Sequence, residues 1–261
     1  MNNQDLFVHQ AKGYALGGTL VKPEQAFIKP QACVALPSIG GFDSSRADSF
    51  SHPGISFESA HSEVIGISRQ DKPTIQETQV QTTILGLNIQ GVVTAESITA
   101  RMVVTTVAEG IQGLGPRPKF SFAGTSLNGL MIDGQPYTLN SSAHFNTVLT
   151  RMQSLFDRSG GARLVSSLSD HREALDHQAV DVNTNLLQTS GDIDEADIET
   201  SEILVIPVAG FGRICIAEVL YNPYICQLSM LRVELDGGGF QGDLLAGAVE
   251  GGASCFPGHG G

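Results

Sequence analysis

The stretch LRVELDGGGFQGDLLAG (231–247) contains the residues that most resemble a chemical site. Its spacing G-x-G-x-x-G, which ends at Gly242, matches the phosphate-binding turn of dinucleotide-binding proteins. That turn opens a helix and is followed, about 20 positions later, by an acidic residue, whereas only 19 glycine-rich residues follow Gly242. The better interpretation is a hairpin, with strands over 231–235 and 242–249 and a turn at 236–239.

The acidic stretch DIDEADIE (192–199) is a second candidate site. Carboxylate oxygens are the ligands that Ca²⁺ prefers, so calcium is the one cofactor that the sequence suggests. The stretch lacks the glycine and the distal glutamate of an EF-hand loop, and a solvated acidic loop is the competing interpretation. The candidate ligands are Asp192, Asp194, Glu195 and Asp197.

Other groupings of reactive residues do not complete a catalytic motif. His171 and His177 are six positions apart, which would place them on opposite sides of a helix. Ser126 lies in GTSLNG, which has one residue too many for a hydrolase nucleophile elbow. Nothing in the sequence brings Asp133 and Glu199 together as a glycosidase carboxylate pair. The sequence therefore favours a role without catalysis and suggests no catalytic residues.

The four cysteines also lack metal-ligand spacing, since none belongs to a C-x-x-C pair. Two disulfides are conceivable: Cys215 with Cys226 across a turn, and Cys33 with Cys255 between the two ends of the chain. A disulfide that closes so long a loop would add about 4 kcal/mol of stability. Four reduced thiols are the alternative.

Composition excludes several classes of partner. The 261 residues carry a formal charge of −12 and only five lysines, so clustered positive charge for nucleic acid or an anionic membrane surface is missing. No apolar stretch reaches the roughly 18 residues that span a bilayer. The first thirty residues do not have the pattern of a secretory signal.

The frame that would position these residues is predicted to be β-rich. Residues 76–107 alternate β-branched with polar residues over two or three strands, with breaks near Gly91 and Ala95. Asn128-Gly129 and Asp133-Gly134 are expected turns. Further strands are expected over 11–21, 33–36, 120–139, 202–208, 212–221 and 225–235.

Two segments between the first strands look less regular. The proline-, serine- and glycine-rich segment 30–53 is expected to be a loop with at most one strand, and 54–69 is expected to be an edge strand at best.

One segment has helical periodicity. Its apolar residues recur on one face, Ser141 or Ser142 could cap its start, and Gly160-Gly161 would end it. The face consists of Phe145, Val148, Leu149, Met152, Leu155 and Phe156.

These elements predict one all-β domain over 1–261 with a helical insertion at about 141–200. Ten to twelve short strands favour an antiparallel, jelly-roll-like β-sandwich. A parallel β-helix is the alternative, although no repeat of 20 to 50 residues is visible.

Several phrases occur in a familiar order: GLNIQGVVTAESITARMVV, SFAGTSLNGLMIDGQPYTL, ILVIPVAGFGRICIAEV and the closing SMLRVELDGGGFQGDLLAGAVEGGASC. In this order the chain resembles the choice-of-anchor bacterial surface proteins of the P type, over about half its length. The matching positions are Gly91–Ile98, Leu130–Pro136, Pro207–Leu220 and Gly242–Gly251. The resemblance implies an exported, β-rich surface or matrix protein.

We therefore expect an extracellular or cell-surface structural or adhesive protein that forms homo-oligomers, filaments or a matrix by strand exchange. The segment NNQDLFVHQAKGYAL (2–16) would be the strand lent to a neighbouring copy. The alternative is a carbohydrate-binding or hydrolytic domain that uses the Ser38–Ser51 loop and the acidic stretch near Asp194. The absence of tryptophan disfavours a glycan platform.

Overall fold

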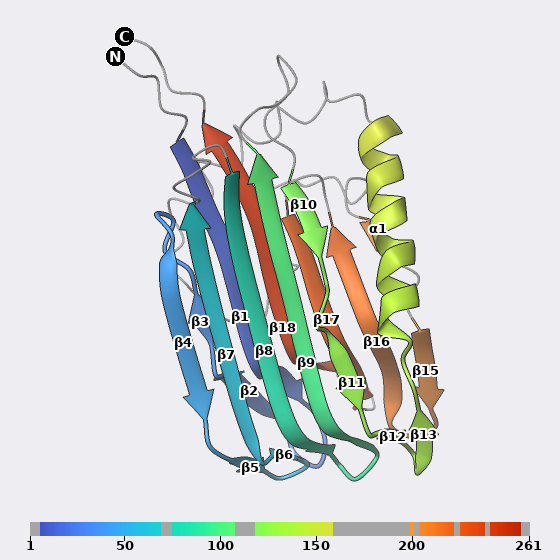
Figure 1. Ribbon diagram of the computed structural model, residues 1–261. Coiled ribbons are helices and arrows are strands. Elements are labelled where there is room, and N and C mark those ends of the chain that lie inside the picture. Colours follow the sequence, from blue (N-terminus) through green and yellow to red (C-terminus); the bar gives the residue numbers. More distant parts are fainter. Residues whose placement is uncertain are drawn as a thin grey trace, which may run out of the picture.

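The computed structural model describes residues 6–68, 75–107, 118–158, 199–200, 204–221, 225–237 and 241–256. These residues form two antiparallel sheets that face each other, and one helix lies at their side (Figure 1). The antiparallel β-sandwich predicted from the strand pattern is confirmed. A parallel β-helix is wrong, because neighbouring strands run in opposite directions.

Sheet A has eight strands. From one edge to the other they are β14 (Glu199–Thr200) and β15 (Leu204–Val208), both paired with β16 (Gly212–Tyr221), then β17 (Ile225–Asp236), β18 (Gln241–Phe256), β1 (Leu6–Leu20), and finally β2 (Ala26–Gln31) and β3 (Val34–Ala35), both paired with β1.

Sheet B has ten strands. β10 (Pro118–Ser121), β11 (Ser126–Asn128) and β12 (Leu130–Ile132) pair with β9 (Val93–Val107), and β13 (Gln135–Tyr137) pairs with β12. Beyond β9 follow β8 (Ile75–Ile89), then β7 (Ser59–Ser68) and β6 (Ile55–Phe57), and at the edge β4 (Gly41–Ala47) beside β7 and β5 (Phe50–His52) beside β6.

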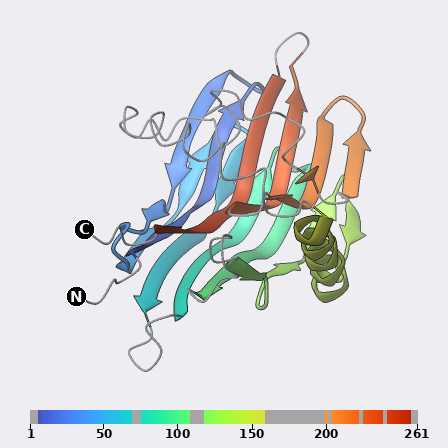
Figure 2. The same cartoon turned by 90° about the horizontal axis from the view of Figure 1, so that it is seen from above.

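The hydrophobic core lies between the sheets, where β1 and β18 face β8 and β9 (Figure 2). Two glycines permit this close approach. A Cβ atom on Gly13 would lie 3.0 Å from Cγ2 of Val80, and one on Gly251 would lie 2.8 Å from Cγ2 of Val104. Since real Cβ atoms rarely come so near, glycine at these two strand positions lets branched side chains of sheet B reach the backbone of sheet A.

The predicted helix is confirmed as α1 (Ser141–Arg158). Phe145 is buried, and its ring centroid lies 4.8 Å from that of Phe122. The expected serine cap is wrong: Asn140 caps the helix, because its Oδ1 accepts a hydrogen bond from the amide of Ala143 at 3.1 Å. Val148 is also buried. The side chains of Met152, Leu155 and Phe156 lie outside the described residues.

Two long strands explain the strongest sequence signal. β8 and β9 form a hairpin with three residues, 90–92, between the paired Ile89 and Val93. Gln90 and Gly91 have φ of 54° and 68°, the positive values that central residues of the favoured hairpin turns adopt. The break expected near Ala95 is wrong, since Ala95 lies within β9 opposite Leu87. The predicted Asp133-Gly134 turn is confirmed between β12 and β13, with φ of 49° and 72°.

The segment 30–53 is not the expected loop, because it contains β3, β4 and β5. β4 has the sequence GFDSSRA, whose outward side chains are exposed and mostly polar, so it lacks the apolar alternation that identifies a half-buried strand. The segment 54–69 was expected to be an edge strand at best, yet β7 lies inside the sheet between β4 and β8.

The predicted terminal hairpin is confirmed. β17 and β18 are paired along their length, from Ile225 opposite Gly252 at one end to Asp236 opposite Gln241 at the other. The predicted disulfides are wrong for the described residues. Cys215 lies opposite Arg232 and Cys226 opposite Tyr221, six positions and therefore about 20 Å apart along the hairpin. A disulfide needs Cα atoms within about 7 Å.

Cys33 is likewise free. It precedes Val34, which pairs with Gly13, whereas the backbone of Cys255 pairs with Phe7 at the far end of β1. The sequence shows only that Cys33 and Cys255 lie near opposite ends of the chain. It does not show which residues of β1 their strands pair with, and that pairing keeps them apart.

Candidate functional site

Sheet A contains a line where the alternation of inward and outward residues shifts by one. On β16, Ile216 and Ala217 are consecutive core residues, and on β17 so are Met230 and Leu231. The same occurs on β1 at Ala15 and Leu16. The pairs Leu16–Ala246, Ala246–Leu231 and Leu231–Ile216 align these positions across four strands. We call this line the crease.

Positive φ angles produce the shift on two of the strands. Ala217 has a φ of 53° and Gly247 a φ of 65°. A residue in this left-handed region rotates the following side chain to the other face of the strand. On β16 the result is that Glu218, which would otherwise point into the core like Ile214 and Ile216, lies on the outer face.

The helix α1 contacts the crease through a hydrogen bond to the backbone of Ala217. Nε2 of His144 hydrogen-bonds the carbonyl oxygen of Ala217 at 2.8 Å, which requires a proton on Nε2. The ring of His144 also contacts that of Phe145, with centroids 5.1 Å apart. The unusual backbone of Ala217 is therefore held by α1.

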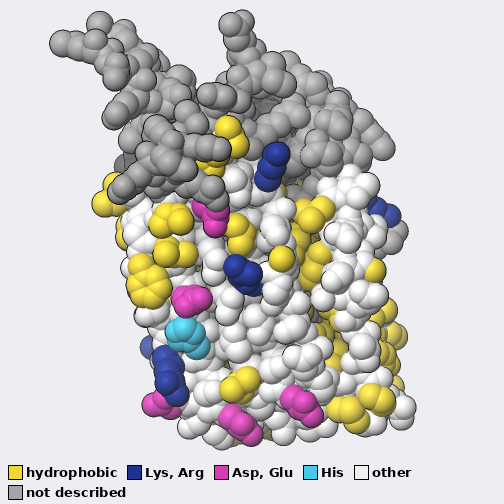
Figure 3. All heavy atoms as spheres, viewed as in Figure 1, with side chains coloured by type: hydrophobic (Ala, Val, Ile, Leu, Met, Phe, Trp, Pro, Cys, Tyr) yellow, Lys and Arg dark blue, Asp and Glu magenta, His cyan; other side chains and the backbone are white. Residues whose placement is uncertain are grey.

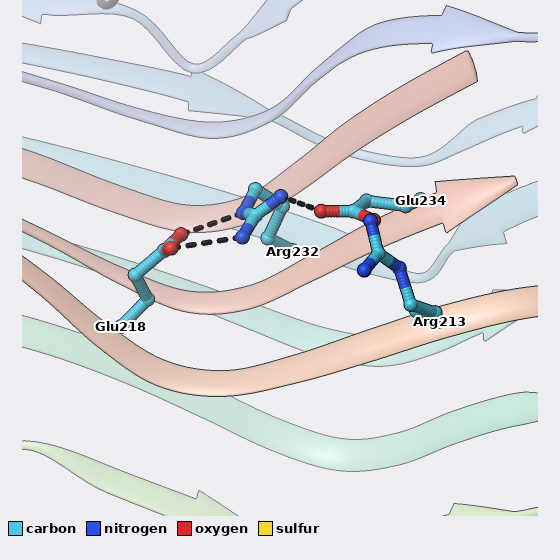
Figure 4. A network of polar contacts seen from close by, with 4 residues as sticks. All are labelled: Arg213, Glu218, Arg232 and Glu234. Atoms are coloured by element: carbon cyan, nitrogen blue, oxygen red, sulfur yellow. Dashed lines mark hydrogen bonds and ion pairs between the residues drawn. The ribbon is translucent and has the colours of Figure 1, made fainter. Parts of the chain in front are cut away.

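A chain of four charged residues lies on the outer face beside the crease (Figure 4). The guanidinium of Arg232 binds Glu218 in bidentate fashion, with Nε–Oε2 at 2.6 Å and Nη2–Oε1 at 2.8 Å. Its Nη1 donates to Glu234, and Glu234 also pairs with Arg213 on β16. We call these four residues the ion network.

The inner end of the ion network is buried. The side chain of Glu218 is 7% exposed and that of Arg232 is 19% exposed. Burial alone would lower the pKa of the Arg232 guanidinium, but the hydrogen bonds and charge of Glu218 outweigh it and raise the pKa. Loss of either side chain would leave the other buried without its ion-pair partner.

Neighbouring polar side chains continue this outer face toward β1. Asp243 lies directly opposite Glu234. Desolvation raises the pKa of Asp243 to about 6, with Arg232 opposing and the carboxylates of Glu234 and Glu218 adding to the shift. Lys12 Nζ lies 3.3 Å from Glu250 Oε2.

The ion network joins β16 to β17 through its side chains. The carboxylates of Glu218 and Glu234 are both held in ion pairs with arginines. Cys215 lies opposite Arg232 but is buried, and burial raises the pKa of its thiol, so it carries little thiolate. The network therefore fixes the register of β16 and β17.

The candidate sites from the sequence separate into two groups. The acidic stretch, with Asp192, Asp194, Glu195 and Asp197, lies outside the described residues, as do His171 and His177. Among the described residues, no group of three or more His, Cys, Asp and Glu side chains could hold a metal ion.

The remaining candidates are described but are not assembled into a site. Asp133 occupies the turn after β12 in sheet B, whereas Glu199 lies in β14 of sheet A. The Ser38–Ser51 segment is mainly the edge strand β4 rather than a binding loop. One of the two segments that were expected to form a carbohydrate-binding site is therefore largely a β-strand.

Sequence reasoning missed the ion network. The register of the β16–β17 hairpin, which starts from the pair Tyr221 and Cys226, would have placed Arg213 opposite Glu234. Glu218 could not have been found this way, because its outward direction depends on the left-handed backbone of an alanine, which is no sequence signal for that conformation.

Residues 7–185 match the model of a family described as a domain of unknown function, DUF8256. This match spans more than half of the chain. The chain belongs to the DUF8256 family. Neither a curated protein nor a solved structure matches it. In this DUF8256 protein the match covers the strands from β1 to β13 and α1, whereas the ion network on β16 and β17 lies after it.

Within the part of the chain that the structure describes, no helix is both long and apolar enough to cross a bilayer.

Proposed function

We propose that this DUF8256 protein is a structural or adhesive β-sandwich that acts through its surface and assembles with further copies of itself. In line with the resemblance to choice-of-anchor surface proteins, its place of action would be the cell surface or the extracellular space. The proposal depends on one observation above all: large hydrophobic side chains are exposed on or beside the edge strands.

Those side chains occur at several edges. Phe27 lies on β2, Phe42 on β4, and Leu204 and Val205 on β15. Among the described residues, each of these strands pairs on one side only, so its other side presents backbone N–H and C=O groups to which a further strand could bind. An exposed edge that is also hydrophobic is the feature by which one sheet recruits another strand.

The route of assembly differs from the strand exchange expected from the sequence. Leu6–Leu20 is not a free arm, because β1 pairs with β18 along its length and with β2 and β3 on its other side. A short loop joins β1 to β2, so β1 cannot leave without its hairpin partner. We therefore propose association between completed sandwiches.

The test is the mass of the purified full chain in solution over a hundredfold range of concentration, by sedimentation velocity. Reversible dimers or larger assemblies at rising concentration are expected. The same samples with reductant should give the same result, because the contacts are non-covalent even though Cys33 is exposed. A monomer at every concentration would refute self-assembly, and electron microscopy would show whether larger assemblies are filaments or sheets.

A further inference from the structure

We propose that β4, the edge strand of sheet B, pairs antiparallel with β4 of a second copy around a twofold axis at Ser44. This inference rests on the proposed function and names the surface that carries it. Three observations support it: the composition of the edge strands, the exposed side chains around β4, and the complementarity of the strand with its own reverse.

The edge strands differ in their protection. Among the described edge strands of four or more residues, β2 contains Pro30, β10 contains Pro118 and β15 contains Pro207. Proline removes a backbone donor and so blocks the addition of a further strand. β4 has no proline, and with seven residues it is the longest of the four. It is therefore the edge that remains open to pairing.

Hydrophobic side chains gather on the outer face at this edge. Phe42 is 62% exposed and lies opposite Ile65 of β7, and Ile67 on the same face is 47% exposed. The adjoining turn carries Ile39, which is also exposed. Figure 3 shows hydrophobic atoms over β4 and β7 at this side of the sheet. Water contact with these side chains is unfavourable, and a neighbouring strand would reduce it.

The reversed copy of β4 complements the strand itself. With the axis at Ser44, residues equally distant from Ser44 face each other, so Phe42 of one copy lies beside Arg46 of the other, twice per dimer. A guanidinium over an aromatic ring is attractive. Ser44 faces its own copy, and Asp43 faces Ser45.

Other registers are less suitable. An axis at Asp43 would place the two copies of Asp43 opposite each other, and like charges across a strand pair are destabilising. An axis at Ser45 would place Asp48 beside Phe42, where an anion meets the negative face of the ring. The register at Ser44 is thus favoured by charge as well as by the aromatic contact.

Arg46 is available for this contact. It pairs with Asp48 at 3.3 Å within its own chain, and both side chains are largely exposed. Such a surface ion pair has a small effect on stability, so the stem and guanidinium of Arg46 can turn toward the ring of the second copy at little loss.

A charge-swap experiment tests the register. Phe42→Arg places two guanidinium groups beside those of Arg46 and should raise the dimer dissociation constant at least about 10-fold. Adding Arg46→Glu to that variant replaces repulsion by ion pairs and should restore the constant to within about 3-fold of the wild type. Sedimentation equilibrium of the full chain measures both.

The matched control is Phe27→Arg, which makes the same change on the edge strand that contains Pro30. It should leave the dissociation constant unchanged. If Phe42→Arg has no effect while the wild type still associates, the proposed interface is overturned and self-assembly stands. A wild type that is monomeric throughout overturns both.

Cross-linking provides a second measurement that does not depend on the stability of the swap variants. Ser44→Cys, in a Cys33→Ser background, brings two thiols opposite each other at the axis, within the Cα separation that a disulfide allows. Mild oxidation should give a covalent dimer on a non-reducing gel. Ser51→Cys on β5 should not, because the two copies of that residue would lie far apart. No cross-link with Ser44→Cys, or equal cross-linking by both variants, would overturn the register.

Discussion

Two pairs of neighbouring strands in sheet A pack against sheet B by different means. On the central pair, β1 and β18, small residues such as Ala11, Gly13 and Gly251 occupy several inward positions, beside larger core residues such as Leu16 and Val249. On the flanking pair, β16 and β17, they hold large side chains such as Ile214, Ile216, Leu228 and Val233. The core is thus formed by close backbone approach in one region and by interlocking side chains in the other.

The difference teaches which mutations each region tolerates. Where the backbone of sheet A lies against branched side chains of β8 and β9, added atoms have no space. Where large side chains fill the gap, removed atoms leave a cavity. The two strand pairs should therefore respond in opposite ways to a change in side-chain size.

The largest effect is expected from truncation in the flanking pair. Ile216→Ala removes a side chain that is 1% exposed and should reduce the free energy of unfolding by about 2–5 kcal/mol. Leu204→Ala is the matched control, since Leu204 faces Ile216 across β15 and β16 but is exposed. Urea denaturation compares them, and equal losses would contradict a core that depends on Ile216.

On the central pair, the informative substitution adds side-chain atoms instead of removing them. Gly13→Val adds atoms where even a Cβ would lie 3.0 Å from Val80 and 3.1 Å from Oγ1 of Thr82, so a loss of about 1–3 kcal/mol is expected. Ala35→Val adds atoms at an exposed position of the neighbouring strand β3. That control should change stability by less than about 0.5 kcal/mol. A stabilised Gly13→Val protein would show that the sheets are not in close contact there.

The crease crosses both strand pairs, and substitutions in it should change the free energy of unfolding by a smaller amount. Gly247→Ala places a side chain at a φ of 65°, with its Cβ 3.0 Å from Cγ2 of Ile98, and should lose about 1–2 kcal/mol. Ala217→Gly relieves the same conformation on β16, where φ is 53°, and should lie within about 1 kcal/mol of the wild type. Equal losses in the two variants would argue against the left-handed backbone as the cause.

Much of the frame was predictable because it depends on local pattern. The alternation over β8 and β9, the turn at Gly91, the helical face of Phe145 and Val148, and the terminal hairpin all follow from neighbours in sequence. These features need no knowledge of which residues meet across the sandwich.

What sequence could not predict depends on partners far along the chain. β4 is polar and lacks apolar alternation, so only its pairing with β7 makes it a strand. The glycines at 13 and 251 resemble turn residues, yet they lie within strands and their role is set by Val80 and Val104 of the facing sheet. Glu218 joins the ion network only because Ala217 turns the backbone.

The smallest expected effect on stability comes from a buried histidine on β1 of the central pair. His9 on β1 is buried, its Nδ1 hydrogen-bonds Oγ1 of Thr78 at 2.8 Å, and Gly40 and Gly66 lie against its ring. Desolvation lowers the pKa of His9 below 6.5. As the pH falls through that value, the unfolded chain therefore binds a proton before the folded chain does, and stability decreases.

The pH profile of stability tests this assignment, with His9→Gln as the variant. Below about pH 6.5 the wild type should lose stability relative to the variant, and above it the difference between their unfolding free energies should be constant. Asp243 acts in the opposite direction, because its raised pKa of about 6 favours the folded state as it protonates. The profiles are therefore compared in an Asp243→Asn background, and parallel curves between pH 5 and pH 8 would show that His9 accepts its proton as readily in the sandwich as in the unfolded chain.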